Sequence, residues 1–176
     1  MRVWVFAALA AAVFAWAPQA QAADIGYLKI VGAKQGAIAG GTGATSVGGV
    51  EVLSFDYGVS APTGAGGMAT GRPVEGPATF TLPWSTAMAK LYTAALTNEN
   101  LSTVEFVDDS TGSGQPGLRF SLKLTNAHIT ALKILDSNGK DPGIDPVVVV
   151  TLTFQKIVVT DGGSGVTAAD DWTAAQ

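Results

Sequence analysis

Residues 50–62 read VEVLSFDYGVSAP, and this stretch decides the fold class of the chain. Large apolar side chains recur at every second position, and small or polar residues stand between them. The apolar set consists of Leu53, Phe55, Tyr57 and Val59. Alternation with a period of two is typical of a β-strand that buries one face. We therefore expect one continuous strand over residues 50–60.

Similar patterns occur along the rest of the chain. Further strands are predicted over residues 26–31, 78–82, 103–107, 118–125, 129–135 and 147–160. Residues 85–96 differ, because their apolar side chains follow the spacing of an amphipathic helix. The core-facing stripe of this helix would consist of Met88, Leu91, Tyr92 and Ala95. The sequence thus predicts an all-β fold with one α-helix, which Ser85 or Thr86 caps at the start and Asn98 or Asn100 ends.

The last predicted strand, VVVVTLTFQKIVVT over residues 147–160, is apolar on both faces. A neighbouring subunit could cover the outer face, since such a strand left bare would promote aggregation. Trp84, at the entrance of the predicted helix, has two interpretations, packing within the chain or anchoring a contact between subunits. The predicted subunit interface accordingly comprises Val147, Val149, Ile157, Val159 and Trp84.

The chain opens with a segment typical of a secretory signal peptide. Residues 1–22 carry one charge, at Arg2, followed by an apolar run and by small residues at Ala20 and Ala22. The apolar run is shorter than the roughly 20 residues of a membrane-spanning helix. We expect cleavage after Ala22 and a mature protein that is secreted or periplasmic and has no membrane contact.

Composition argues against several classes of function. Removing Arg2 from ten Lys and Arg residues leaves nine against fourteen Asp and Glu, a net charge of −5, which does not attract nucleic acid. The chain has no Cys and one His, so neither a zinc site nor a Ser-His-Asp arrangement is expected. We interpret His128 as an ordinary hydrogen-bonded strand residue. The sequence therefore predicts no catalytic residues, no metal and no cofactor.

Four motifs, taken in order, resemble the Hcp family. They are YLKI at residues 27–30, EVLSFDYGVS at 51–60, the helical stretch STAMAKLYTAALTNENLSTVEF at 85–106 and VVVVTLTFQKI at 147–157. The resemblance extends over about residues 24–160. It implies a compact β-barrel with one helix, the subunit of the inner tube of type VI secretion systems. A signal peptide distinguishes this chain from ordinary tube subunits.

The resemblance also implies an assembly. Six copies would form a ring, the rings would stack, and the spike, sheath and effector proteins of a type VI system would be partners. The Gly- and Pro-rich loop over residues 61–76 corresponds to the family's loop that reaches a neighbouring ring. The residues expected to mediate stacking are Pro62, Gly66, Met68, Arg72 and Pro73.

Two alternatives remain open at this point. The chain could be an exported Hcp-like ring or filament with no injector, or an exported β-sandwich module that binds carbohydrate or a surface partner. Aromatic residues exposed together on one loop face would favour the binding module. We divide the chain into a signal peptide (1–22), one domain (23–160) and a flexible Gly-, Ala- and Asp-rich tail (161–176), within which Trp172 is unexplained.

Overall fold

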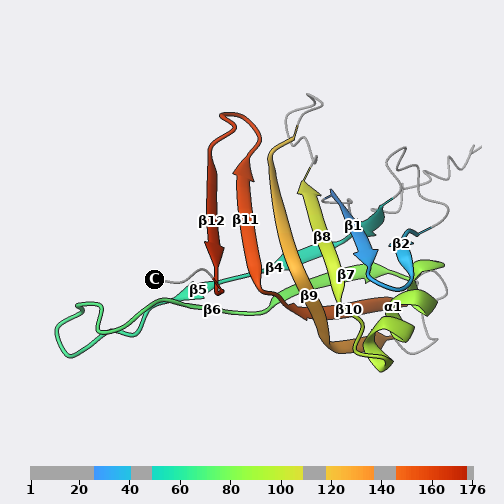
Figure 1. The fold of residues 1–176 in the computed structure, drawn as a ribbon, viewed down its shortest axis with the longest axis horizontal. Coiled ribbons are helices and arrows are strands. Elements are labelled where there is room, and N and C mark those ends of the chain that lie inside the picture. The colour runs from blue at the N-terminus through green and yellow to red at the C-terminus, as the bar shows by residue number, and fades with distance from the viewer. Residues whose placement is uncertain (1–25, 41–48, 109–117, 137–145, 174–176) are drawn as a thin grey trace, which may run out of the picture.

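The computed structural model describes residues 26–40, 49–108, 118–136 and 146–173. The predicted signal peptide and its cleavage site lie outside these residues. Within the described residues, one helix, α1 (Ala87–Leu96), accompanies the strands, as Figure 1 shows. The strands are β1 (Gly26–Gly32), β2 (Gly36–Ile38), β3 (Val50–Val52), β4 (Ser54–Asp56), β5 (Val59–Ser60), β6 (Val74–Glu75), β7 (Ala78–Pro83), β8 (Leu101–Asp108), β9 (Phe120–Leu135), β10 (Val147–Thr153), β11 (Lys156–Asp161) and β12 (Thr167–Asp171). The prediction of an all-β fold with one helix is confirmed.

Most of the strands belong to one antiparallel sheet that wraps around the core. Its main path runs β2-β1-β8-β9-β10-β7-β4, and β11 and β12 extend a branch from the first half of β9. The pairing does not close strand to strand. Instead, β3 pairs with β1 and β4 pairs with β7, so the chain at Leu53 connects the two edges of the sheet.

The single strand expected over residues 50–60 is three short strands. β3 pairs with β1, β4 with β7 and β5 with β6, so each has a different partner. A strand must bend wherever it passes from one partner to the next. The amide of Leu53, at the first bend, donates a hydrogen bond to the carbonyl of Thr81 at 2.8 Å.

The two strands expected over residues 118–125 and 129–135 are one strand, β9. Its first half pairs with β8 and β11 and its second half with β10. Asn126 lies at the junction with a φ of +52°. A single residue in this left-handed conformation lets the strand turn the corner of the barrel without ending.

The strand expected over residues 147–160 is divided into β10 and β11 by Phe154 and Gln155. The division reverses which alternate residues point inward. Even-numbered residues such as Leu152 and Phe154 are buried up to this point, whereas the odd-numbered Ile157 is buried beyond it. Within the segment expected to be a flexible tail, residues 167–171 form β12, which pairs with β11, so the expectation is wrong for these residues.

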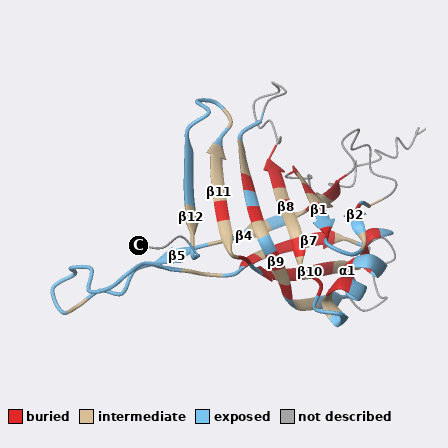
Figure 2. Cartoon of the chain, in the orientation of Figure 1, coloured by how far each residue is buried: buried red, intermediate tan, exposed pale blue. Residues whose placement is uncertain are grey.

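The core lies between the wrapped strands and is closed at one end by α1 (Figure 2). Met88 and Leu91 of the predicted stripe are buried, together with Ala87 and Ala94, whereas Ala95 is only partly buried and Tyr92 is 50% exposed. Thr86 occupies the N-cap position without a capping side-chain hydrogen bond. Asn98, with a φ of +47°, follows the last turn and ends the helix as expected.

A buried carboxylate joins the end of the helix to the β1–β2 turn. Oε1 of Glu99 accepts hydrogen bonds from the amides of Lys34 at 2.7 Å and Gln35 at 2.9 Å, and Oε2 accepts one from Nε2 of Gln35 at 2.9 Å. The hydrogen bonds from Gln35, with that from Lys34, hold the pKa of Glu99 below its usual range. The ionised carboxylate therefore stabilises the fold.

This cluster predicts a pH-dependent effect of Glu99→Gln. A lowered folded-state pKa gives stability that is present above the unfolded pKa of about 4.3 and is lost as the pH falls through the lower folded value. We expect the variant to melt a few degrees below the wild type at pH 7, and the difference to shrink below pH 4. Thermal unfolding followed by circular dichroism measures both. An unchanged difference across this range would mean that the charge of Glu99 plays no part.

Candidate functional site: assembly surfaces

The most prominent feature of the surface is a hairpin arm, residues 59–75, that projects from the barrel (Figure 1). Its root is the β5–β6 pair, where Val59 lies opposite Glu75. Farther out, Thr63 and Ala69 form an isolated bridge, and the amide of Thr70 donates to the carbonyl of Pro62 at 2.8 Å. The arm is thus an ordered hairpin over most of its length.

A tight turn forms the tip of the arm. The amide of Gly67 donates to Gly64 at 3.0 Å, and Gly66 and Gly67 have φ values of +122° and +79°. Glycine adopts these backbone conformations without strain. Met68, next to the turn, is 79% exposed.

The five residues predicted to mediate stacking all lie on this arm and are exposed (Figure 2). They are Pro62, Gly66, Met68, Arg72 and Pro73. Their exposure shows that the arm packs against little of its own barrel beyond its root. Their part in stacking stays a prediction.

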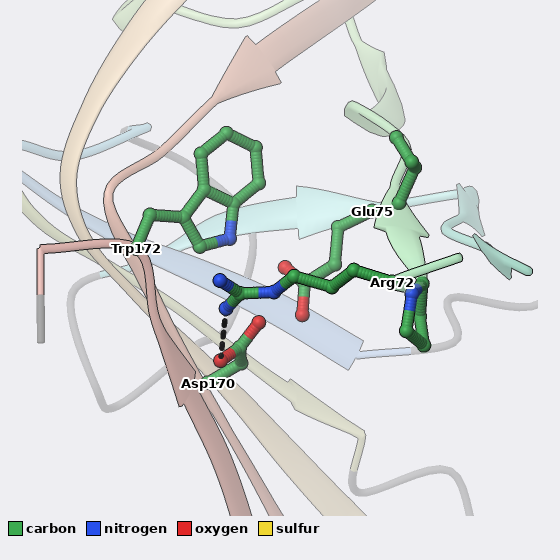
Figure 3. A pocket seen from close by; sticks show the side chains of 6 residues that line it. Arg72, Glu75, Asp170 and Trp172 are labelled. Carbon is green, nitrogen blue, oxygen red and sulfur yellow. Dashed lines mark ion pairs between the residues drawn. The ribbon is translucent and has the colours of Figure 1, made fainter. Parts of the chain in front are cut away.

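The root of the arm meets the end of β12. Nη2 of Arg72 lies 3.7 Å from Oδ1 of Asp170 (Figure 3). Arg72, Glu75, Asp170 and Trp172 line a cleft of about 270 Å³ together with Pro73 and Val74. Trp172 also packs against Phe154, with ring centroids 6.0 Å apart, and Phe154 against Tyr57 at 6.1 Å. Trp172 is therefore explained as a contact between the C-terminal strand and the barrel.

Two acids lie close together in this cleft. Burial, followed by the negative charge of Asp170, raises the pKa of Glu75 above its usual range. Burial and the charge of Glu75 raise the pKa of Tyr57 to about 12. Oε2 of Glu75 is buried and has no hydrogen-bond partner among the described residues. The surroundings of Glu75 therefore disfavour its ionised form.

The outer faces of the two halves of the barrel differ in chemistry. On β7, β10 and β9, Val149 lies between Thr81 and Lys133, and Thr151 lies between Thr79 and Ala131. We call the first of these surfaces the neutral face, defined by Thr79, Thr81, Ala131, Val147, Val149 and Thr151, and the charged residue Lys133 adjoins it beside Val149. On the other half, Glu105 lies between Lys29 and Lys123. We call this second surface the charged face, defined by Lys29, Glu105, Lys123, Lys156, Val158 and Asp171.

The residues predicted for the subunit interface do not share one surface. Val147 and Val149 are half-buried on the neutral face, and Trp84 is 52% exposed beside the end of β7. Ile157 is 3% exposed within the core, and Val159 packs against the core. The expected outward orientation of Ile157 and Val159 is incorrect, because the break at Phe154 reverses the alternation of inward and outward side chains.

Sequence reasoning missed the cluster at the root of the arm. Tyr57, Glu75 and Trp172 come from three distant parts of the chain, and only the unexplained Trp172 gave any signal. His128 is half-buried in β9, opposite Thr153. Within the described ranges, no group of three potential metal ligands occurs. No helix among the described residues is long and apolar enough to cross a membrane.

Comparisons with known proteins agree on one family. The family model described as "Type VI secretion system effector, Hcp" matches residues 27–160. A crystal structure of an Hcp protein is 25% identical, with a TM-score of 0.76 over 83% of this chain and 98% of that chain. Hcp3, a secreted protein from Pseudomonas aeruginosa, is also 25% identical, with a TM-score of 0.67 over 83% and 98%.

A mutant of Hcp1 from E. coli EAEC 042 is 23% identical and shares the fold, with a TM-score of 0.72 over 85% and 99% of the two chains. A search of curated protein sequences gave no match.

These findings define a structural protein of type VI secretion, built as a β-barrel with one helix. The chain belongs to the Hcp family. Its function is that of a tube-forming structural protein, as the family resemblance implied.

Proposed function

We propose that the mature chain, residues 23–176, assembles as a homohexameric ring, and that arms from one ring contact the next ring in a stack. The observation that carries this proposal is that one barrel has both a neutral outer face and a projecting arm. A surface made mainly of Thr, Val and Ala side chains, with Lys133 as its charged neighbour, loses less solvation when a second protein covers it than the charged face would lose.

The proposal extends to location and chemistry. The signal segment would direct the chain out of the cytoplasm, with cleavage after Ala22, and the ring would act without catalysis. Spike, sheath and effector proteins of a type VI system would be its partners. Half-exposed aromatic residues do not gather on one loop face among the described residues, since Trp84 and Tyr92 lie beside or on α1 and Trp172 lies at the arm. This separation gives the carbohydrate-binding alternative less support.

Light scattering after size exclusion tests ring formation directly. We expect residues 23–176 to elute with six times the mass of one chain. Val149→Glu places a carboxylate on the neutral face beside Lys133, where a covering subunit would bury it. Burying a charge opposes association even when a partner is near, because the lost hydration can exceed the gain from pairing. We expect this variant to be a folded monomer.

Val158→Glu provides the matched control. Val158 is also half-buried on an outer face, but it lies on the charged face between Lys123 and Ala169. We expect this variant to remain hexameric. Dissociation of both variants, or of Val158→Glu alone, would place the subunit contact elsewhere. A monomeric wild type at tens of micromolar would contradict intrinsic ring assembly.

A further inference from the structure

The direction in which the arm leaves the barrel is not fixed by its two-residue strands alone. β5 and β6 pair through two residue pairs, Val59 with Glu75 and Ser60 with Val74, and β5–β6 form a sheet separate from the barrel. The link back to the barrel includes the hydrogen bond from the amide of Gly76 to Gly58 at 2.8 Å. So short a connection leaves the arm free to pivot unless another element holds it.

That element is the C-terminal end of β12. It is carried on the barrel by the five-residue pairing of β12 with β11. Trp172 is seated by its ring contact with Phe154, and its amide donates to the carbonyl of Gln155 at 3.1 Å. Asp170 and Trp172 therefore present a carboxylate and an indole ring from the barrel toward the base of the arm, as Figure 3 shows.

The arm presents complementary groups to this pair. Arg72 lies 3.7 Å from Asp170, and Glu75 lies in the same cleft beside Trp172. The Arg72 and Asp170 side chains are about half exposed, so this ion pair alone would contribute little. The contact gains strength because guanidinium, carboxylate and indole meet in one cleft rather than as isolated pairs.

We propose that Asp170 and Trp172 form a clamp on Arg72 and Glu75 that fixes the direction of the arm relative to the barrel. Residues 167–172 thus hold the arm, although more than ninety residues separate this segment from the arm in the sequence. Any consequence for the stacking of rings rests on the function proposed above. The clamp itself is a property of one chain and is tested there.

The clamp carries a dependence on pH. Four residues surround Glu75. Tyr57 belongs to the segment before β5, Arg72 belongs to the arm, and Asp170 and Trp172 belong to the end of β12 and the residue after it. When Glu75 is ionised it repels Asp170, and when Glu75 is protonated this repulsion is absent. Because burial and Asp170 raise the pKa of Glu75, lowering the pH toward that value should tighten the clamp.

Distance measurement between two spin labels tests the clamp. The chain has no Cys, so Met68→Cys at the tip and Lys123→Cys on the barrel place single labels without further changes. Labelled chains are diluted with unlabelled chains, so that only distances within one chain are recorded. We expect one narrow distribution for the otherwise unchanged chain, and one that is about twofold or more broader for Asp170→Ala with Trp172→Ala, because both clamp groups are then lost.

Three further variants separate the clamp from a general loss of structure. Asp170→Asn keeps Trp172 and β12 in place and should broaden the distribution to a smaller extent. Lys156→Met removes the ion pair of Lys156 with Asp171, 3.8 Å long, which lies at the same end of the hairpin but involves neither clamp residue, and should leave the distribution unchanged. Glu75→Gln should remove the narrowing that occurs as the pH is lowered.

Equal widths for the doubly substituted and unchanged chains would overturn the clamp. Broadening by Lys156→Met as well would show that the hairpin as a whole, and not the two clamp groups, holds the arm. These results do not depend on ring formation, so a monomeric chain with a fixed arm would contradict the proposed assembly and leave the clamp standing.

Discussion

Replacing Phe106 by alanine is expected to lower the free energy of unfolding by about 3–5 kcal/mol. Phe106 is fully buried in β8. Its ring centroid lies 5.2 Å from that of Phe55, 5.8 Å from Phe80 and 5.6 Å from Phe120. The substitution removes apolar area from the core and leaves a cavity that the paired strands cannot fill by moving inward.

Urea denaturation of residues 23–176, followed by circular dichroism, measures the loss. Tyr92→Ala is the control, because Tyr92 is half exposed on α1 and its removal opens no cavity. We expect this control to change the free energy of unfolding by about 0.5 kcal/mol or less. Both variants are compared at one protein concentration, since assembly would add to the measured stability. Similar losses for the two variants would mean that the phenylalanine cluster is not the centre of the core.

The same cluster shows why the fold could be predicted. Phe55 belongs to the alternating stretch at residues 53–59, and Phe106 and Phe120 belong to two further predicted strands. Alternation reports which side chains point inward, and this information is local to each strand. The sequence pattern therefore indicated most of the strands and the helix, while the barrel arrangement came from the resemblance to the Hcp family.

The places where the prediction is wrong share one physical cause. At Leu53, Asn126 and Phe154 the chain passes from one strand partner to another, and the backbone bends or breaks there. Pairing partners are set by distant segments, so periodicity within one segment cannot reveal them. The consequence is largest after Phe154, where the reversal of inward and outward residues brings Ile157 into the core.

The assembly surfaces were predictable to different degrees. The arm is visible as a Gly- and Pro-rich stretch, since these residues favour turns and projecting loops. Its clamp was not predictable, because Arg72 and Asp170 meet only once β12 is placed beside the barrel. β12 itself was missed because its residues Thr167, Ala168 and Ala169 have none of the large apolar side chains that mark a strand. Pairing with β11 nevertheless satisfies the hydrogen-bonding groups of their backbone.

Gly162→Ala is expected to lower the free energy of unfolding by about 2–3 kcal/mol, a large effect for one methyl group. Gly162 follows β11, and its amide donates to the carbonyl of Arg119 at 2.9 Å. A Cβ atom at this position would overlap the carbonyl oxygen of Leu118 and would lie 2.6 Å from the carbonyl carbon. The obstacle is backbone, so no side-chain rotation relieves it, and the chain after β11 must move away from Leu118 and Arg119.

Gly58→Ala is the matched control for this substitution. No atom lies within 4 Å of a Cβ built at Gly58, and its φ lies outside the left-handed region. We expect its free energy of unfolding to change by about 0.5 kcal/mol or less in urea denaturation. Gly162 lies at the end of β11 that pairs far from Lys156 and Asp171, so the β12 end that holds the arm should remain in place. An equal effect of the two substitutions would show that loss of glycine flexibility, and not the clash with Leu118, determines the cost.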